Sequence, residues 1–145
     1  GDWFFPLWLV DFQRQSIWAH TLSLVPNSLW IGFGVNAINY SPGADAIIPG
    51  TSDLNLIPAH PHNWAVEVLS ETGIIGFLPL LAAISWMVIG LLANFRRTGD
   101  LAVLAGIAVS LGYWGSGLFN FSFWSAWWQV SFFLMTSFCL AGCKK

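Results

Sequence analysis

The chain has 145 residues, of which 56% are hydrophobic and only 8% are charged. Soluble domains carry roughly 25% charged residues, so this composition excludes an ordinary soluble domain and is typical of a membrane protein. Many of the ten Trp residues stand near the ends of apolar segments, where amphipathic rings favour the boundary between water and lipid. We therefore expect an all-α integral membrane protein.

The start of the chain does not match a signal peptide, because no basic stretch and no small-residue cleavage site precede Val10. The first residue is Gly1 rather than Met, and we expect the chain to be a piece of a longer protein. The apolar stretch 2–10 is too short to span a membrane alone. It is interpreted as the end of an earlier transmembrane helix or as a segment lying at the membrane surface.

An amphipathic helix is predicted to begin after Asp11, whose side chain can cap it, and to stop at Pro26. Apolar residues recur between these points at near-helical spacing: Phe12, Ile17, Trp18, Leu22 and Val25. The segment 30–61 that follows is rich in Gly, Pro, Ser and Asn, which predicts a long loop with turns. Loops of such length in compact proteins are usually functional or disordered.

Two histidines stand directly ahead of a long apolar run. Pro61 suits the first turn of a helix, so we expect a helix that runs from Pro61 through His62 and Asn63 toward the membrane, with His60 just outside it. A histidine at the outer end of a membrane helix is a functional candidate. The alternative is that both histidines are caps at the membrane surface.

A polar stripe follows the histidines. Asn63, Glu67 and Glu71 are spaced by four residues, so they share one face of the expected helix. Carboxylates that approach lipid are costly and are commonly functional. The alternative is that both glutamates are solvated.

Three apolar runs predict transmembrane helices at about 73–94, 101–119 and 124–142. A kink is expected at Pro79 in the first of them. The chain would then consist of an outer loop region, 1–72, and a membrane region, 73–145.

Charge sets the expected orientation. Basic pairs follow the first and the third apolar run, so two crossings place both pairs on one face, which the positive-inside rule makes cytoplasmic. They are Arg96 with Arg97 and Lys144 with Lys145. Most of the acidic residues lie in 1–72, on the opposite side.

The spacing of the two histidines also allows a metal site. The H-x-H spacing of His60 and His62 can supply two imidazoles to a metal ion, with Glu67 or His20 as a third ligand, but no third ligand stands at a fixed spacing.

Arg14 is the only base on the outer side, and its planar guanidinium can hold a phosphate or pyrophosphate. The alternative for Arg14 is a surface ion pair with Asp11, three residues earlier on the same helix face.

Two blocks of the sequence resemble the O-antigen ligase and polymerase superfamily. The first combines an arginine, a tryptophan four residues on, a proline and a G-x-G turn: Arg14, Trp18, Pro26, Gly32 and Gly34. The second is a His-Asn, Glu, Glu-x-Gly block that leads into a membrane helix: His62, Asn63, Glu67, Glu71 and Gly73. The resemblance implies the C-terminal part of a longer multi-pass protein of a bacterial inner membrane, whose preceding part would carry a second functional arginine.

The resemblance also implies a function. It is the transfer of a glycan from an undecaprenyl pyrophosphate carrier to a hydroxyl of a lipid A-core, another glycan or a protein, at the periplasmic face. No metal, cofactor or nucleic acid is implied. His62 is then expected to be the general base and Arg14 the pyrophosphate clamp. Residues expected to contact substrate or to orient His62 are His60, Asn63, Glu67 and Trp18.

Other functions remain open at this point. A polysaccharide polymerase or a protein O-oligosaccharyltransferase of the same superfamily would use the same site with another acceptor. An alternative from another class is a non-catalytic membrane subunit or a transporter segment with histidines at the membrane surface. A transporter is expected to carry ionisable groups inside its spans, and residues 73–94 and 101–142 contain no Asp, Glu, Lys, Arg or His.

Overall fold

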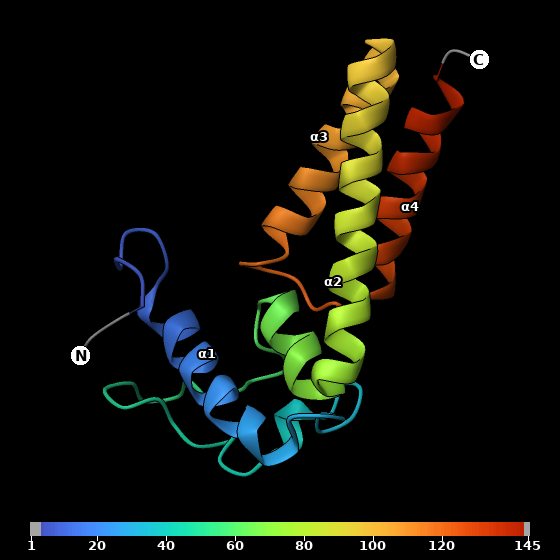
Figure 1. Ribbon diagram of the computed structural model, residues 1–145. Helices are drawn as coiled ribbons and strands as arrows, with labels where there is room; N and C mark the ends of the chain where they lie inside the picture. The colour runs from blue at the N-terminus through green and yellow to red at the C-terminus, as the bar shows by residue number, and fades with distance from the viewer. Residues whose placement is uncertain (1–3, 144–145) are drawn as a thin grey trace.

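The computed structural model describes residues 4–143. Over that range the regular elements are all helical, apart from one isolated bridge between Ile47 and Asn55. In chain order they are α1 (Phe12–Leu24), the short 3-10 helices η1 (Val25–Ser28) and η2 (Ile38–Tyr40), α2 (Trp64–Thr98), α3 (Leu101–Ser116) and α4 (Ala126–Ala141). Helices α2, α3 and α4 run side by side, and α1 and the long loop gather at one end of this bundle (Figure 1). The expected helical class is confirmed.

Helix α1 begins and ends where the sequence predicts. The Asp11 side chain caps it by accepting a hydrogen bond from Arg14 N at 2.9 Å, and α1 ends just before η1, which contains Pro26. Its buried residues are Gln15, Ile17, Trp18 and Thr21. The buried face is therefore partly polar, whereas Phe12 and Leu22 of the predicted apolar face are exposed.

Gln15 explains why a polar side chain is buried here. Its side-chain amide donates to Phe5 O at 2.8 Å and to Val10 O at 2.9 Å, and its oxygen accepts from Phe5 N at 2.9 Å. A buried amide is tolerated when its hydrogen bonds are made. The apolar stretch before Asp11 is thereby folded back onto α1.

Helix α2 is longer than the predicted span and is broken inside. Its 35 residues correspond to roughly 52 Å at 1.5 Å per residue, against about 30 Å for the hydrocarbon core of a membrane. The only non-helical dihedral angles inside it are those of Gly73 (φ 62°, ψ −167°). The backbone dihedral angles at Pro79 stay helical, so the helix is interrupted at Gly73 and a bend at Pro79 stays a prediction. The break at Gly73 separates a segment 64–72 from the segment 74–98, which contains nearly all of the predicted span.

The loop 29–34 holds the break in place, and we call this contact the glycine junction. At a helix break the last carbonyls and the first amides lose their partners within the helix. Four backbone hydrogen bonds between the loop and α2 replace them: Phe33 N to Ser70 O (2.9 Å), Gly34 N to Glu71 O (2.9 Å), Ile74 N to Leu29 O (2.9 Å) and Ile75 N to Trp30 O (3.2 Å).

Close backbone approach explains two glycines of the junction. A Cβ on Gly32 (φ 71°) would overlap the backbone of Glu71, and a Cβ on Gly73 (φ 62°) would overlap the backbone of Trp30. Both residues also have positive φ, a conformation that L side chains rarely adopt. The G-x-G turn and the Glu-x-Gly pair, far apart in the sequence, thus form one contact.

After the break, α2 exposes large apolar side chains. Trp86 is 83% exposed and Ile89 is 65% exposed. Within residues 4–143, α2 is the one helix long and apolar enough to cross a membrane, and α3 and α4 are shorter apolar helices. An exposed apolar surface of this kind is consistent with a membrane protein. The three-span topology stays a prediction.

The connection between α3 and α4, residues 117–125, includes the end of the predicted span 101–119 and the start of the predicted span 124–142. As a consequence α3 and α4 have 16 residues each, or roughly 24 Å of helix. The end of α2 that carries Arg96 and Arg97 lies at the same end of the bundle as the end of α4 (Figure 1). Lys144 and Lys145 lie outside the described residues.

Candidate functional site

The histidines lie in the loop before α2 and not in the helix. Helix α2 begins at Trp64, and Asn63 caps it, accepting hydrogen bonds from Ala65 N (3.0 Å) and Val66 N (3.2 Å). The prediction that the helix runs from Pro61 through His62 is wrong, because His62 has the left-handed φ of 56°. The Asn63 side chain caps the first amides of the helix, so α2 begins directly after it.

Buried contacts hold His62 in this conformation. A left-handed non-glycine residue costs of order 1–3 kcal/mol and persists only where its surroundings determine it. On one side Trp18 Nε1 donates to Pro61 O at 2.9 Å, and Trp18 is 5% exposed. On the other side Trp64 N donates to Gly117 O at 3.0 Å. Trp18 therefore positions the histidine loop from α1.

The ring of His62 is held by the α3–α4 connection. Its Nδ1 lies 3.0 Å from the carbonyl oxygen of Asn120. A carbonyl oxygen can only accept, so the hydrogen of a neutral His62 ring belongs on Nδ1 when this bond is made. The lone pair of Nε2 is then available as a base.

His60 packs against His62 and accepts from it. His62 N donates to His60 Nδ1 at 3.1 Å, and the ring centroids are 4.1 Å apart. Burial, together with repulsion from His62, lowers the pKa of His60 to about 4. His60 is therefore neutral at physiological pH, which leaves its Nδ1 free to accept the hydrogen bond.

Glu67 lies on segment 64–72, outside the predicted span, and is 0% exposed. One carboxylate oxygen accepts from Ser122 Oγ at 2.7 Å and the other from Phe123 N at 2.5 Å. Burial raises the pKa of Glu67 to about 7, and repulsion from Glu71 adds to the rise while the two hydrogen bonds oppose it. The interpretation of the glutamates as solvated is wrong, because the α3–α4 connection covers this one.

Glu71, one turn further on, is 2% exposed and connects two loops. Its carboxylate accepts from Asn36 N (2.7 Å) and Ile38 N (3.2 Å) in the long loop and from Trp124 Nε1 in the α3–α4 connection. Backbone amides and an indole N–H are donors only, so a carboxylate is suited to receive all three.

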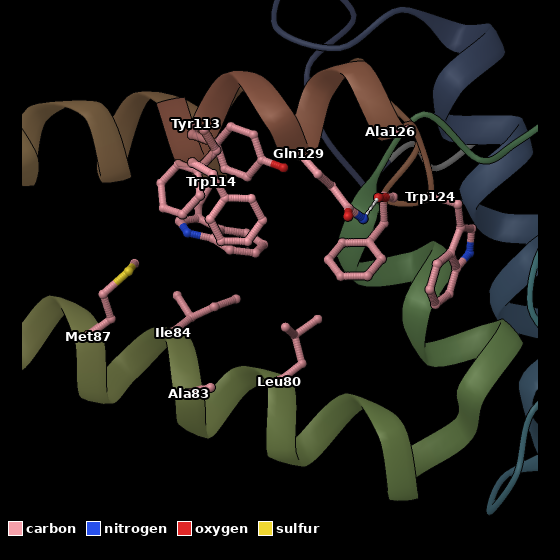
Figure 2. A pocket seen from close by; sticks show the side chains of 12 residues that line it. Leu80, Ala83, Ile84, Met87, Tyr113, Trp114, Trp124, Ala126 and Gln129 are labelled. Carbon is pink, nitrogen blue, oxygen red and sulfur yellow. Dashed lines mark hydrogen bonds between the residues drawn. The ribbon is translucent and has the colours of Figure 1, made fainter. Parts of the chain in front are cut away.

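A polar hollow of about 300 Å³ opens beside His60, and His62 is not among its lining residues. It is lined by residues from three separate segments: Asn36, Ala59, His60, Ser122, Trp124 and Ser125. Trp124 also lines an apolar groove of about 540 Å³ between α2, α3 and α4. Figure 2 shows this groove, with Leu80 and Ile84 of α2 facing Trp114 and Gln129, and Trp124 at one end. Trp124 therefore lines both the polar hollow and the apolar groove.

Arg14 pairs with Asp11, the alternative that its spacing allowed. Its Nη1 bonds an Asp11 carboxylate oxygen. Partial burial acts to raise the pKa of Asp11, but the hydrogen bonds and the charge of Arg14 outweigh it and lower that pKa. Arg14 Nε is buried without a hydrogen-bond partner among residues 4–143. Arg14 is not among the residues that line the polar hollow.

The structure brings only part of the predicted site together. His60 and His62 are in contact, whereas Trp18, Asn63 and Glu67 are buried and hydrogen-bonded to protein groups. No sequence signal singled out the α3–α4 connection, an aromatic stretch without charge, although Asn120 and Ser122 lie within it. In the part of the chain that the structure describes, no three His, Cys, Asp or Glu side chains are grouped to hold a metal ion.

Fold and site are thus consistent with a helical membrane protein that carries a polar site at one end of its bundle. Residues 12–81, which include both motif blocks, match the family model described as O-antigen ligase. Over 121 residues, 82% of this chain, the sequence is 23% identical to a protein of Rickettsia conorii and 25% identical to one of Rickettsia prowazekii, both named as candidate polysaccharide ligases. These matches confirm the resemblance to the O-antigen ligase superfamily.

The matched region spans 29% of the length of each of these relatives. No solved structure matches the chain.

Proposed function

We propose that this chain forms part of an O-antigen ligase-like glycosyltransferase. The donor is a glycan linked to undecaprenyl pyrophosphate, and the acceptor is a hydroxyl of a lipid A-core or another glycan. The reaction takes place at the periplasmic face of the bacterial inner membrane. The observation that carries the proposal is the His62 ring, held by the Asn120 carbonyl at 3.0 Å and packed on His60, which lines a polar hollow. Trp124, on the wall of that hollow, also lines an apolar groove.

That arrangement suits a substrate that is polar at one end and a lipid at the other. The polar hollow, with His60 and Asn36 in its lining, offers amide, hydroxyl and imidazole groups to a sugar. The groove behind Trp124 is lined almost wholly by apolar side chains. Sites that take such ligands combine apolar walls with a few placed polar groups.

In the proposed reaction, His62 Nε2 takes the proton of the acceptor hydroxyl as its oxygen attacks the anomeric carbon of the donor sugar. The bond between that carbon and the pyrophosphate oxygen breaks, and pyrophosphate leaves on its carrier with the electron pair. An imidazole is suited to this proton transfer near neutral pH. The Asn120 carbonyl stabilises the imidazolium that forms, because it accepts the Nδ1 hydrogen.

Arg14 is proposed as the clamp on the departing pyrophosphate. Its buried, unpartnered Nε supports this role, because a buried donor without a partner is costly unless a ligand completes it. Binding would require the guanidinium to turn from Asp11 toward the diphosphate. A phosphate oxygen pair can receive both arms of the guanidinium, which a single carboxylate oxygen of Asp11 does not.

The remaining predicted residues divide into two roles. His60 lines the polar hollow and is proposed to contact the substrate. Trp18 and Asn63 are proposed to hold the histidine loop, since their polar atoms bond Pro61 O and the first amides of α2.

The test is His62→Ala in the full-length protein, in a strain that lacks the native enzyme. Loss of a positioned base lowers the rate by about 10²–10⁴, so carrier-linked glycan should accumulate while acceptor-linked glycan disappears. His20→Ala is the matched control, because His20 lies on α1 and packs against Gly43, outside the polar hollow. Near-normal transfer by His62→Ala, with the protein present in the membrane, would disprove the general-base role.

The same assay tests Arg14. Arg14→Ala should abolish transfer and Arg14→Lys should restore only part of it, because a lysine offers a point charge instead of a planar fork. Asp11→Ala removes the ion pair and a helix cap worth about 1 kcal/mol, so it should leave transfer nearly unchanged. Equal transfer by Arg14→Ala and the unmodified protein would remove Arg14 from the site.

A further inference from the structure

The α3–α4 connection, residues 117–125, contributes to the site although it lies outside the region that matches the family model, residues 12–81. Its Asn120 carbonyl accepts from the His62 ring. Its Ser122, Trp124 and Ser125 line the polar hollow. A connection without regular structure does not hold such a position by itself, so the contacts that fix it decide the geometry at His62.

Glu67 bonds the connection two and three residues after Asn120. Both of its carboxylate oxygens are taken, one by Ser122 Oγ at 2.7 Å and one by Phe123 N at 2.5 Å. The hydroxyl of Ser122 in turn accepts from Trp124 N at 3.2 Å. With 0% exposure, Glu67 has no surface to offer a substrate.

We propose that Glu67 is a positioning residue that fixes the α3–α4 connection through Ser122 and Phe123, so that the Asn120 carbonyl orients the His62 ring. The inference rests on the proposed role of His62 as the base. Glu67 itself neither gives nor takes a proton in the reaction.

The chemistry of the two bonds separates positioning from proton transfer. A glutamine at position 67 can accept from Phe123 N through its oxygen and donate to Ser122 Oγ through its amide, which preserves both contacts. An alanine preserves neither. A proton-transferring carboxyl group would be lost in both variants, so glutamine rescues a positioning role and not a catalytic one.

The experiment measures kcat and KM for the acceptor in the full-length protein reconstituted in membranes, with carrier-linked glycan as the donor. Glu67→Ala should lower kcat about 100-fold, the effect of a misplacement near 1 Å, with KM little changed. Glu67→Gln should keep most of the rate. The amount of folded protein is measured for each variant by size-exclusion chromatography.

A pH profile gives a readout that a merely structural role would not move. The Asn120 carbonyl stabilises the imidazolium of His62, so its loss in Glu67→Ala should shift the acidic limb of kcat to lower pH. The titratable group in direct contact with His62 is His60, and residues 117–125 carry no charge. Loss of folded protein alone would lower the measured rate by the same factor at every pH and would leave the acidic limb at the same pH.

Each outcome decides the inference. A Glu67→Gln variant as inactive as Glu67→Ala would assign proton transfer to Glu67 and overturn the positioning role, as would a normal kcat for Glu67→Ala. If Glu67→Ala does not fold, Ser122→Ala removes one of the two bonds, and an unchanged kcat and limb in that variant overturn the proposal. Near-normal transfer by His62→Ala disproves the proposed function instead, whatever the Glu67 variants do.

Discussion

The two segments of α2 on either side of Gly73 have opposite patterns of burial. In segment 64–72 the polar residues Glu67, Ser70 and Glu71 are buried, at 0%, 1% and 2% exposure. In segment 74–98 the apolar residues are the exposed ones, among them Trp86 and Ile89. One continuous helical stretch therefore buries polar residues before Gly73 and exposes apolar residues after it.

The difference indicates that segment 64–72 is surrounded by protein groups and segment 74–98 by apolar surroundings. Buried carboxylates are tolerated where protein donors meet them, and the long loop and the α3–α4 connection supply such donors to Glu67 and Glu71. Exposed Trp and Ile are favourable where the surroundings are themselves apolar, as in a lipid bilayer. We expect the glycine junction to be the boundary between these environments, and the following experiments test the contrast.

The largest effect is expected from Gly73→Ala, which removes the boundary itself. The new methyl group would overlap the backbone of Trp30, and no flexible side chain is there to move away. We expect the junction to open and little folded protein to remain in detergent extracts, measured by size-exclusion chromatography with fluorescence detection.

Gly99→Ala is the control at a glycine with ordinary left-handed backbone. Gly99 has φ 63° and ψ 17°, and nothing lies within 4 Å of its added Cβ. Gly73 has ψ −167°, a conformation that is essentially restricted to glycine. Gly99→Ala should therefore be destabilised only by the left-handed backbone, about 1–2 kcal/mol. Equal losses for the two variants would show that neither the close contact nor the backbone conformation at Gly73 matters.

A smaller effect is expected from a charge placed on the exposed apolar segment. Ile89→Arg should disfavour membrane insertion by about 3 kcal/mol if segment 74–98 meets lipid. Ala65→Arg, on the half-buried first turn of α2, should leave insertion unchanged. Insertion is measured by glycosylation mapping of sites engineered on both sides of α2, and normal insertion of Ile89→Arg would contradict a lipid-facing segment.

The smallest effect is expected from pH, because Glu67 and the half-buried His60 change the stability of the fold with pH in opposite directions. The folded pKa of Glu67, about 7, lies above its ordinary 4.5, so its contribution to stability is present at low pH and is lost as pH rises through 7. The folded pKa of His60, about 4, lies below its ordinary 6.5, so its contribution is lost as pH falls from 6.5 toward 4.

Single variants separate these two contributions. In Glu67→Gln the Tm of the full-length protein in detergent should rise with pH between about 4 and 6.5 more steeply than in the unmodified protein. In His60→Asn the Tm should fall more steeply as pH rises from about 4.5 to 7. A Tm profile that neither variant changes would mean that both groups titrate at their ordinary pKa values.

Local patterns in the sequence determined the helical class, the limits of α1 and the resemblance to the O-antigen ligase superfamily. Asp11 and Pro26 bound α1 because capping and the missing amide of proline act over a few residues. The same local reasoning misplaced the start of α2 and missed its break. It predicted Pro61 as a first helical residue, whereas the helix begins after its cap Asn63, and it did not predict the break at Gly73.

Only the tertiary structure decided what surrounds the histidines. The hydrogen bonds from His62 to the Asn120 carbonyl and from Ser122 to Glu67 join residues 58 and 55 positions apart. No helical or strand periodicity links residues at such separations, and an uncharged aromatic stretch carries no chemical signature of its own. Glu67, an expected substrate contact, is buried, because the donors that satisfy its carboxylate come from a segment that the chain reaches only after the rest of α2 and α3.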